Sequence, residues 1–235
     1  LYTVRDAMAA DVEGTLAAIR AMGLDYIELA GTYGRPATEF AGVLNRHGLR
    51  VSGSHVGIDA LEGNFGAVVE ESRIFGNEWI IVPYIGQERR NWEELARTFS
   101  AFADRLRAEG LRFAYHNHDF EFGPDQGMRQ LLAHSSPSVS FQVDLGWVRY
   151  AGDDPAKFMR EAGSRASLVH LKDLAPDREN PHVVAGDGQV DWTSVLMACD
   201  EVGVQFGAIE MDHPPHDPIT DTGTCVKYFQ ARGLS

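Results

Sequence analysis

Short apolar runs alternate with longer stretches of helical periodicity along the whole chain. Runs of four to six residues rich in β-branched, leucine and aromatic side chains predict strands. They lie at 24–29, 49–54, 78–82, 111–115, 139–143, 167–171 and 205–209, and residues 1–4 predict part of an eighth strand at the N-terminus. The intervening segments have apolar residues three or four positions apart and predict amphipathic helices, among them 12–22, 92–109 and 192–202.

A glycine ends several predicted helices just before the next strand begins, at Gly23, Gly48, Gly110 and Gly203. Repeated helix and strand units imply parallel strands joined by right-handed crossovers. The glycine-rich phosphate loop of nucleotide-binding sheets is missing, because Gly186-Asp187-Gly188 is too short to match one. Eight units close a barrel. The sequence therefore predicts an α/β fold, a (β/α)8 TIM barrel, with one domain spanning residues 1–235.

The composition narrows the classes of partner. Acidic residues number 34 against 21 lysines and arginines, so the net charge is −13 and the chain should repel a phosphate backbone. The sequence has neither a basic run nor an apolar stretch long enough to span a bilayer. Its two cysteines, Cys199 and Cys225, are too few for a disulfide framework. We expect a cytoplasmic protein that binds neither nucleic acid nor membrane.

Polar side chains gather where the predicted strands end. They are Glu28, His55, His116, Asn117, His118, Glu121, Asp144, His170, Lys172, Asp173, Glu210, Asp212 and His213. The carboxyl ends of barrel strands form the active site, so these groups can converge. Crowded carboxylates repel one another unless a cation offsets their charge. Oxygen ligands with an imidazole suit Mn²⁺, Mg²⁺, Co²⁺ or Zn²⁺, and the absence of thiolates disfavours a structural zinc site.

Each of these residues also has a simpler explanation. A single histidine or aspartate at a strand end is more often a helix cap or a hydrogen-bonded loop residue. Trp147 and Phe120 are more simply explained as residues that pack in the protein interior, although either ring could stack on a sugar. Polar residues at the ends of four successive strands are harder to explain in this way, and we expect a functional site.

Several motifs resemble the sugar phosphate isomerase/epimerase family, a xylose isomerase-like barrel group that includes tagatose 3-epimerase, hydroxypyruvate isomerase and inosose dehydratase. The motifs are Leu1–Asp6, Gly23–Leu29, Tyr115–Phe122, Val143–Trp147, His170–Asp173 and Gly186–Trp192. The resemblance implies one divalent metal ion bound by Asp144, His170 and Glu210. In the branch with the His-Asn-His signature it implies Glu121 as the fourth ligand, with His116 or His118 as alternatives.

A departure from the epimerases concerns Trp147, which stands where those enzymes have a substrate-contacting histidine. It favours the branch that resembles inosose dehydratase and enzymes acting on keto-sugars. Barrels of this family often form homo-oligomers, but the sequence itself leaves the oligomeric state open.

Such a site favours removal of a proton next to a carbonyl, with the metal acting as a Lewis acid on the enediolate. Glu210 and His118 are the candidate bases, and Lys172 is expected to polarise an oxygen. His55, His116, Trp147 and Glu28 are expected to contact the substrate.

Three functions follow from these expectations. Return of the proton to another carbon or face makes an isomerase or epimerase of a small sugar, our first expectation. Loss of a β-hydroxyl or glycosyl group makes a lyase acting on a keto-inositol or a 3-keto-glycoside. A barrel that binds sugar without turnover is the third. The site lacks an evident phosphate pocket, which favours a neutral sugar.

Overall fold

The computed structural model describes residues 1–234. The strands are β1 (Tyr26–Leu29), β2 (Arg50–His55), β3 (Trp79–Val82), β4 (Arg112–His116), β5 (Val139–Asp144), β6 (Ala166–Leu171), β7 (Asp173–Leu174), β8 (His182–Val183) and β9 (Phe206–Ile209). The α-helices are α1 (Arg5–Ala10), α2 (Val12–Ala21), α3 (Ala37–Arg46), α4 (Ile58–Gly63), α5 (Phe65–Phe75), α6 (Trp92–Ala108), α7 (Gly127–His134), α8 (Leu145–Tyr150), α9 (Pro155–Ala162), α10 (Trp192–Val202) and α11 (Pro218–Gln230). Short 3-10 turns occupy Gln87–Arg89, Phe120–Phe122 and Gly163–Arg165.

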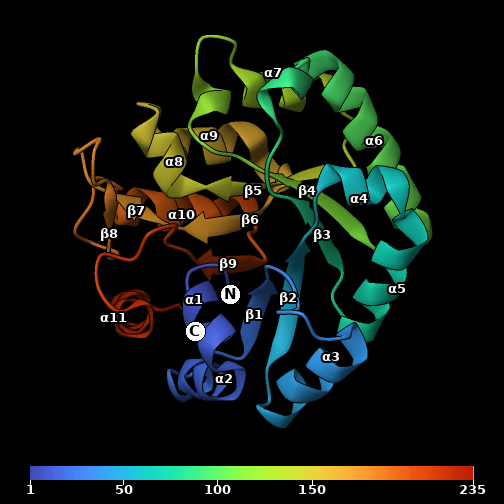
Figure 1. Ribbon diagram of the computed structural model, residues 1–235. Helices are drawn as coiled ribbons and strands as arrows, with labels where there is room; N and C mark the ends of the chain where they lie inside the picture. Colours follow the sequence, from blue (N-terminus) through green and yellow to red (C-terminus); the bar gives the residue numbers. More distant parts are fainter. Residues whose placement is uncertain (235) are drawn as a thin grey trace.

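Seven parallel strands form one curved sheet in the order β1-β2-β3-β4-β5-β6-β9. The sheet curls into a nearly closed barrel, and the helices surround it (Figure 1). The register pairs His116 with Gln142 and Asp144 with His170, so the carboxyl ends of neighbouring strands lie at one level. The predicted α/β barrel and the seven strands predicted from residue 24 onward are confirmed.

The strand predicted at residues 1–4 is wrong. The chain turns there, because the Val4 amide donates to the Leu1 carbonyl at 3.2 Å and the Arg5 amide donates to the Tyr2 carbonyl at 3.2 Å. Helix α1 follows at once, so no length remains for a strand ladder. Within residues 1–234, β1 and β9 therefore each pair on one side only. Their free edges face a cavity of about 660 Å³ whose lining includes Ile27 and Phe206.

The longest helix shows how the sequence pattern positions the barrel wall. The side chain of Asn91 accepts a hydrogen bond from the Glu94 amide and caps α6. Leu95, Phe99, Phe102 and Leu106 lie on one face of α6 and are all buried, as the spacing predicts. The predicted helices at 12–22 and 192–202 likewise form α2 and α10. Within residues 1–234, no helix is both long and apolar enough to cross a membrane.

Strands β7 and β8 form a small antiparallel hairpin beyond the end of β6. The Asp173 carboxylate organises this region by accepting hydrogen bonds from the backbone amides of Leu174, Gly186, Gly188 and Val190 and from the Trp192 indole. A Cβ atom on Gly188 would lie 2.0 Å from Asp173 Oδ1, so a glycine is required there. The Gly186-Asp187-Gly188 segment thus wraps a carboxylate of its own chain.

Candidate active site

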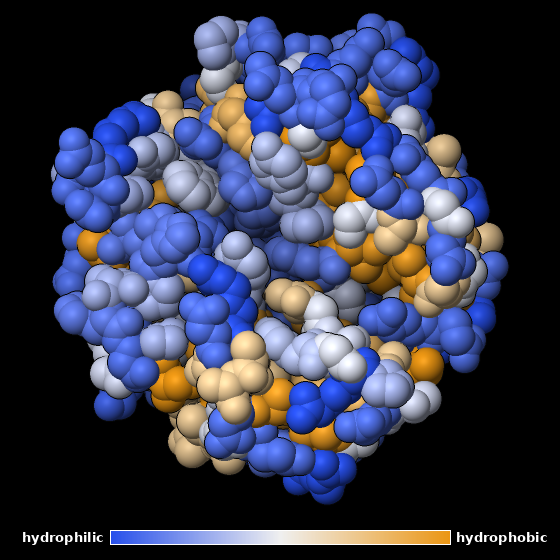
Figure 2. Space-filling model, in the orientation of Figure 1, coloured by the Kyte–Doolittle hydropathy of each residue, from blue (hydrophilic) through white to orange (hydrophobic). Residues whose placement is uncertain are grey.

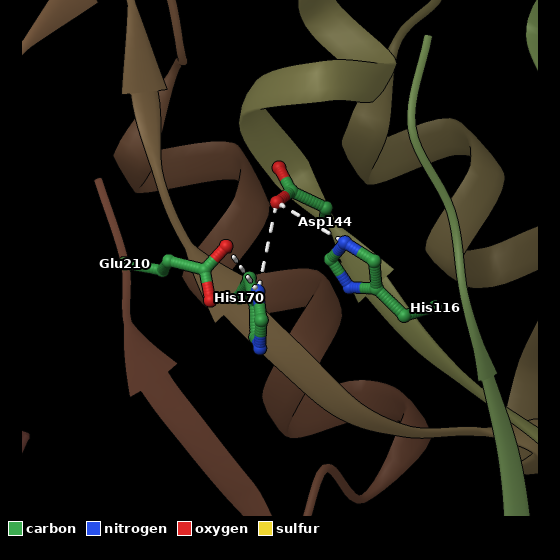
Figure 3. A group of neighbouring side chains, drawn as sticks. All are labelled: His116, Asp144, His170 and Glu210. Carbon is green, nitrogen blue, oxygen red and sulfur yellow. Dashed lines mark ion pairs between the residues drawn. The ribbon is translucent and has the colours of Figure 1, made fainter. Parts of the chain in front are cut away.

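Four buried side chains converge at the carboxyl ends of four neighbouring strands (Figure 3). His116 ends β4, Asp144 ends β5, His170 lies in β6 and Glu210 follows β9. His170 Nδ1 is 3.6 Å from Asp144 Oδ2 and 3.4 Å from Glu210 Oε1, and His116 Nε2 is 4.0 Å from Asp144 Oδ2. Atoms that bind one metal ion at about 2.1 Å lie roughly 3–4 Å apart, so this group could hold an ion.

Unpaired polar atoms mark the same place. His116 Nδ1 and His170 Nδ1 are buried and lack a hydrogen-bond partner of good geometry within residues 1–234, while Asp144 Oδ2 forms an ion pair with the Lys172 ammonium. Buried polar atoms are ordinarily hydrogen-bonded, so the two imidazole nitrogens without a hydrogen bond indicate space for a ligand or an ion. Oxygen and imidazole donors without sulfur fit Mn²⁺, Zn²⁺, Co²⁺ or Mg²⁺.

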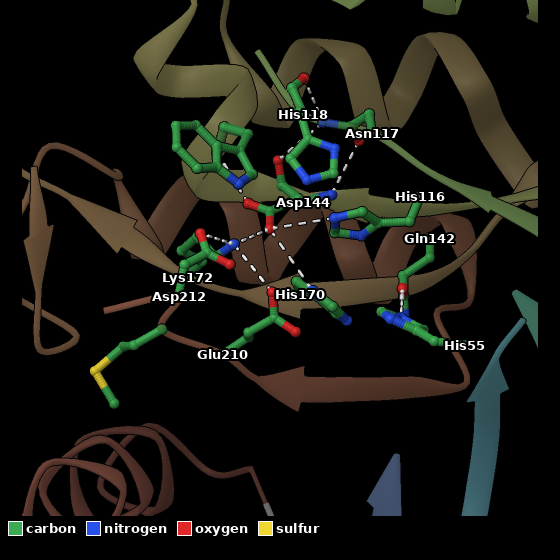
Figure 4. A network of polar contacts seen from close by, with 12 residues as sticks. His55, His116, Asn117, His118, Gln142, Asp144, His170, Lys172, Glu210 and Asp212 are labelled. Atoms are coloured by element: carbon green, nitrogen blue, oxygen red, sulfur yellow. Dashed lines mark hydrogen bonds and ion pairs between the residues drawn. The ribbon is translucent and has the colours of Figure 1, made fainter. Parts of the chain in front are cut away.

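The ammonium group of Lys172 lies beside the same carboxylates (Figure 4). Its Nζ atom is 2.9 Å from Asp144 Oδ2, 3.1 Å from Glu210 Oε1 and 2.9 Å from Asp212 Oδ2. Burial alone would lower the pKa of Lys172, but the three carboxylates outweigh it and raise the pKa above its ordinary value. Lys172 is therefore a charged side chain at the centre of the site.

The protonation of the acidic groups follows from these neighbours. Burial would raise the pKa of Glu210, but the charges of His170 and Lys172 outweigh burial and hold it well below the usual range. The pKa of Asp144 is lowered in the same way, against burial, by Lys172 and His170. Both carboxylates are ionised, which is the form that binds a cation.

A second polar group fixes the orientation of His170. Glu28 Oε1 is 2.8 Å from His170 Nε2 and 2.9 Å from His55 Nε2. Gln142 donates from Nε2 to Glu28 Oε2, and its Oε1 lies 3.1 Å from His55 Nε2. Because Glu28 binds one ring nitrogen of His170, the other, Nδ1, faces Asp144 and Glu210. The sequence predicts substrate contact for Glu28 and His55; in the structure Glu28 pairs with His170 directly, and His55 pairs with Glu28.

Glu121 lies outside the four-residue group. Its carboxylate accepts hydrogen bonds from the Tyr115 hydroxyl and from the His118 amide, the latter at 2.8 Å. Burial raises the pKa of Glu121 to about 7, although these hydrogen bonds favour the ionised form. The group contains His116, one of the alternatives that the sequence left open for the fourth position. Glu121 instead shapes the loop that carries His118.

His118 and Trp147 border the group on the side of solvent. Burial, and then the positive charge of Lys172, lower the pKa of His118, so its imidazole is neutral. The Lys172 Nζ atom lies 5.1 Å from the centre of the Trp147 ring. Figure 2 shows a hollow at the centre of this face, with many hydrophilic residues around it.

Three further residues shape the site, and the sequence assigned none of them a role there. Asn117 ties β4 to β5, because its Oδ1 accepts from the Asp144 amide at 3.0 Å. Gln142 supports Glu28, and Asp212 pairs with Lys172. Gln142 did carry a signal, since it is a polar residue inside the apolar run 139–143. A buried amide in such a strand needs partners on neighbouring strands.

Comparison with known proteins places the chain in a family. The model of the xylose isomerase-like TIM barrel family matches residues 16–224. An inosose dehydratase of Lacticaseibacillus casei is 24% identical over 215 residues, which cover 83% of this chain and 70% of that protein. A rhizopine catabolism protein of Rhizobium meliloti is 25% identical over 252 residues, which cover 89% of this chain and 78% of that protein.

Solved structures share the fold. A sugar phosphate isomerase/epimerase of Parabacteroides distasonis has a TM-score of 0.84 at 21% identity, covering 97% of this chain and 95% of that one. A probable 3-DHS dehydratase of Bacillus anthracis has a TM-score of 0.70 at 13% identity, covering 94% of this chain and 93% of that one. At these identities the likeness concerns the fold alone. Because the family model matches most of the chain, residues 16–224, the chain belongs to the xylose isomerase-like TIM barrel family.

Proposed function

We propose that the protein is a metal-dependent lyase that eliminates a hydroxyl or glycosyl group from a keto-inositol or 3-keto-sugar. The observation that carries the proposal is the convergence of His116, Asp144, His170 and Glu210 beside the charged Lys172. The curated relatives support a lyase, because one that spans 83% of this chain is named an inosose dehydratase. Isomerisation or epimerisation, our first expectation from the sequence, starts with the same proton transfer.

The four converging side chains are the proposed ligands of one divalent ion. A bound ion would supply Lewis-acid chemistry at the carbonyl oxygen of the substrate. His116 replaces Glu121 as the proposed fourth ligand, because Glu121 is already bonded to Tyr115 and His118. Glu28 then pairs with His170 Nε2, so that Nδ1 is the nitrogen that would face the ion.

His118 is the proposed base that removes the proton next to the carbonyl. Its imidazole is neutral, its buried Nδ1 has no hydrogen-bond partner within residues 1–234, and the residue as a whole is half-buried. Glu210, the other candidate, is held ionised by Lys172 and His170 and so is a weak base. We therefore give Glu210 the role of a ligand.

The elimination balances without any further reactant. The α-carbon loses its proton to His118, the electron pair forms a carbon–carbon double bond, and the β-carbon–oxygen bond breaks. The departing oxygen takes up a proton and leaves as water or an alcohol. Lys172 is proposed to stabilise negative charge on a substrate oxygen during proton removal, since its ammonium stays charged. Trp147 is proposed to contact the substrate beside Lys172.

Incubation of the metal-loaded protein with scyllo-inosose in D2O tests the proposal by mass spectrometry. We expect a product lighter by one water. A product of unchanged composition that carries solvent deuterium in a new position would instead identify an isomerase or epimerase. Binding of the keto-sugar with neither deuterium uptake nor loss of water would contradict both and leave a sugar-binding barrel.

Replacement of the proposed base gives a sharper test. His118→Gln should lower kcat by about 10²- to 10⁴-fold, the usual contribution of a general base, and abolish deuterium exchange. His134→Gln is the matched control, because His134 is exposed at the end of α7. Normal exchange in His118→Gln would transfer the role of base to another residue.

A further inference from the structure

A chain of aromatic rings borders the mouth of the barrel. The ring centres of Tyr84 and His118 are 5.6 Å apart, and those of His118 and Trp147 are 6.0 Å apart. The chain continues from Trp147 to His182 at 6.0 Å and from His182 to His213 at 5.1 Å. These residues follow β3, β4, β5 and β9 or lie in β8, so they reach from one side of the mouth to the other. We call the five residues the aromatic arc.

Tyr84 lies at one end of the arc and is 51% exposed, yet Arg90 restrains it. Arg90 donates from Nη2 to the Tyr84 hydroxyl at 3.1 Å and from Nε to the Ile85 carbonyl at 3.2 Å. The guanidinium of Arg90 also lies 3.3 Å from the centre of the Phe120 ring. An exposed aromatic side chain that is already fixed loses little conformational freedom when a ligand packs against it.

Two members of the aromatic arc, Trp147 and His118, lie beside the proposed catalytic residues. Trp147 lies over Lys172, and His118 is the proposed base. A ligand whose reacting carbons lie between Lys172 and His118 contacts the rings of Trp147 and His118 with its reacting part. Tyr84 is the next ring of the arc after His118, and the proposed reaction gives it no acid, base or ligand role. It is therefore available to a part of the substrate that does not react.

We propose that Tyr84 forms a subsite for a second ring, so that the preferred substrate is a 3-keto-glycoside with a cyclic aglycone. The inference rests on the proposed lyase function. In such a glycoside the anomeric carbon is β to the ketone. Loss of the proton from the intervening carbon forms a double bond to the anomeric carbon, the glycosidic carbon–oxygen bond breaks, and the aglycone leaves as an alcohol with a proton.

Two matched compounds test the subsite, methyl and phenyl 3-keto-β-D-glucopyranoside, which differ only in the aglycone. The phenyl compound should bind roughly three- to tenfold more tightly by calorimetry, as expected for one aromatic stacking contact. In Tyr84→Ala this ratio of affinities should fall to about one. The same substitution at Tyr26, an exposed tyrosine at the start of β1 and so at the opposite end of the strands, should leave the ratio unchanged.

Two outcomes would overturn the subsite: equal affinities for the two compounds in the unaltered protein, or an unchanged ratio in Tyr84→Ala. Failure of the subsite is distinguishable from failure of the proposed function. If scyllo-inosose is dehydrated but aglycones are not discriminated, only the subsite is wrong. If neither glycoside nor inosose is bound or converted, the proposed function is wrong as well.

Discussion

At the scale of single residues, the site depends on two nitrogen atoms of one histidine. Glu28 binds His170 Nε2, and His170 Nδ1 faces Asp144 and Glu210. Burial would lower the pKa of His170, but the carboxylates of Glu210 and Glu28 outweigh it and raise the pKa well above the ordinary value. In the metal-free protein His170 is thus protonated at neutral pH, whereas a metal ligand must be neutral.

Metal binding should therefore release a proton and tighten as pH rises. Below the raised pKa of His170, affinity should increase about tenfold per pH unit and then level off above it. Stability has the opposite sign in the metal-free protein: the charged His170 stabilises it below the unfolded pKa, and this is lost as pH rises through the folded pKa. Calorimetric titration in buffers of different ionisation enthalpy counts the released protons.

A substitution distinguishes this linkage from a general effect of pH. Glu28→Gln removes one of the three carboxylates that raise the pKa of His170, the others being Glu210 and Asp144. Proton release should then occur at lower pH, and metal should bind more weakly at high pH because His170 loses its support. Metal affinity that is independent of pH in the unaltered protein would contradict the raised pKa.

At the scale of elements, much of the fold could be predicted because periodicity and helix caps are local. Seven strands and the helices α2, α6 and α10 follow the apolar pattern. The Asp191 side chain caps α10, as its place before Trp192 predicts. The hairpin of β7 and β8 was not predicted, because two-residue strands carry no periodic signal. It depends instead on Asp173, whose partners lie up to 19 positions away.

Loss of the Asp173 carboxylate should destabilise the protein strongly. Asp173→Ala leaves amides and an indole N–H without an acceptor in a buried region, which costs about 3 kcal/mol or more. In a chain of this size that corresponds to a fall in Tm of roughly 6–12 °C, measured by scanning calorimetry. Asp187→Ala, in the same loop but exposed, should change Tm by less than a degree or two. Equal effects of the two substitutions would contradict the assigned role.

At the scale of the whole molecule, the proposed ligands tie four neighbouring strands together, from β4 to the end of β9. Negative charge also concentrates there, since Glu28, Asp144, Glu210 and Asp212 face Lys172 and His170. A divalent ion would offset this excess of negative charge, and an ion that binds only the folded chain stabilises it.

Mn²⁺ or Zn²⁺ should therefore raise Tm, and a chelator should reverse the rise. At a free metal concentration 100 times Kd the gain is about 2.7 kcal/mol. Asp144→Asn should remove the response to metal, whereas Asp212→Asn, which removes a partner of Lys172 outside the ligand group, should retain it. A Tm that metal raises equally in Asp144→Asn would place the ion elsewhere.

The sequence by itself determined seven of the strands, the helices α2, α6 and α10 and the polar side chains that gather at the strand ends, because apolar periodicity and residue type are properties of short segments. The resemblance to the family came from its motifs. Only the tertiary structure decided how those side chains are paired. Glu28 pairs with His170, and Lys172 pairs with three carboxylates. Glu121 bonds to Tyr115, and His116 is the residue that lies in the four-residue group. The tertiary structure also placed a turn at residues 1–4, where the sequence predicted a strand. These outcomes depend on distances between strands far apart in the chain, which no local pattern encodes.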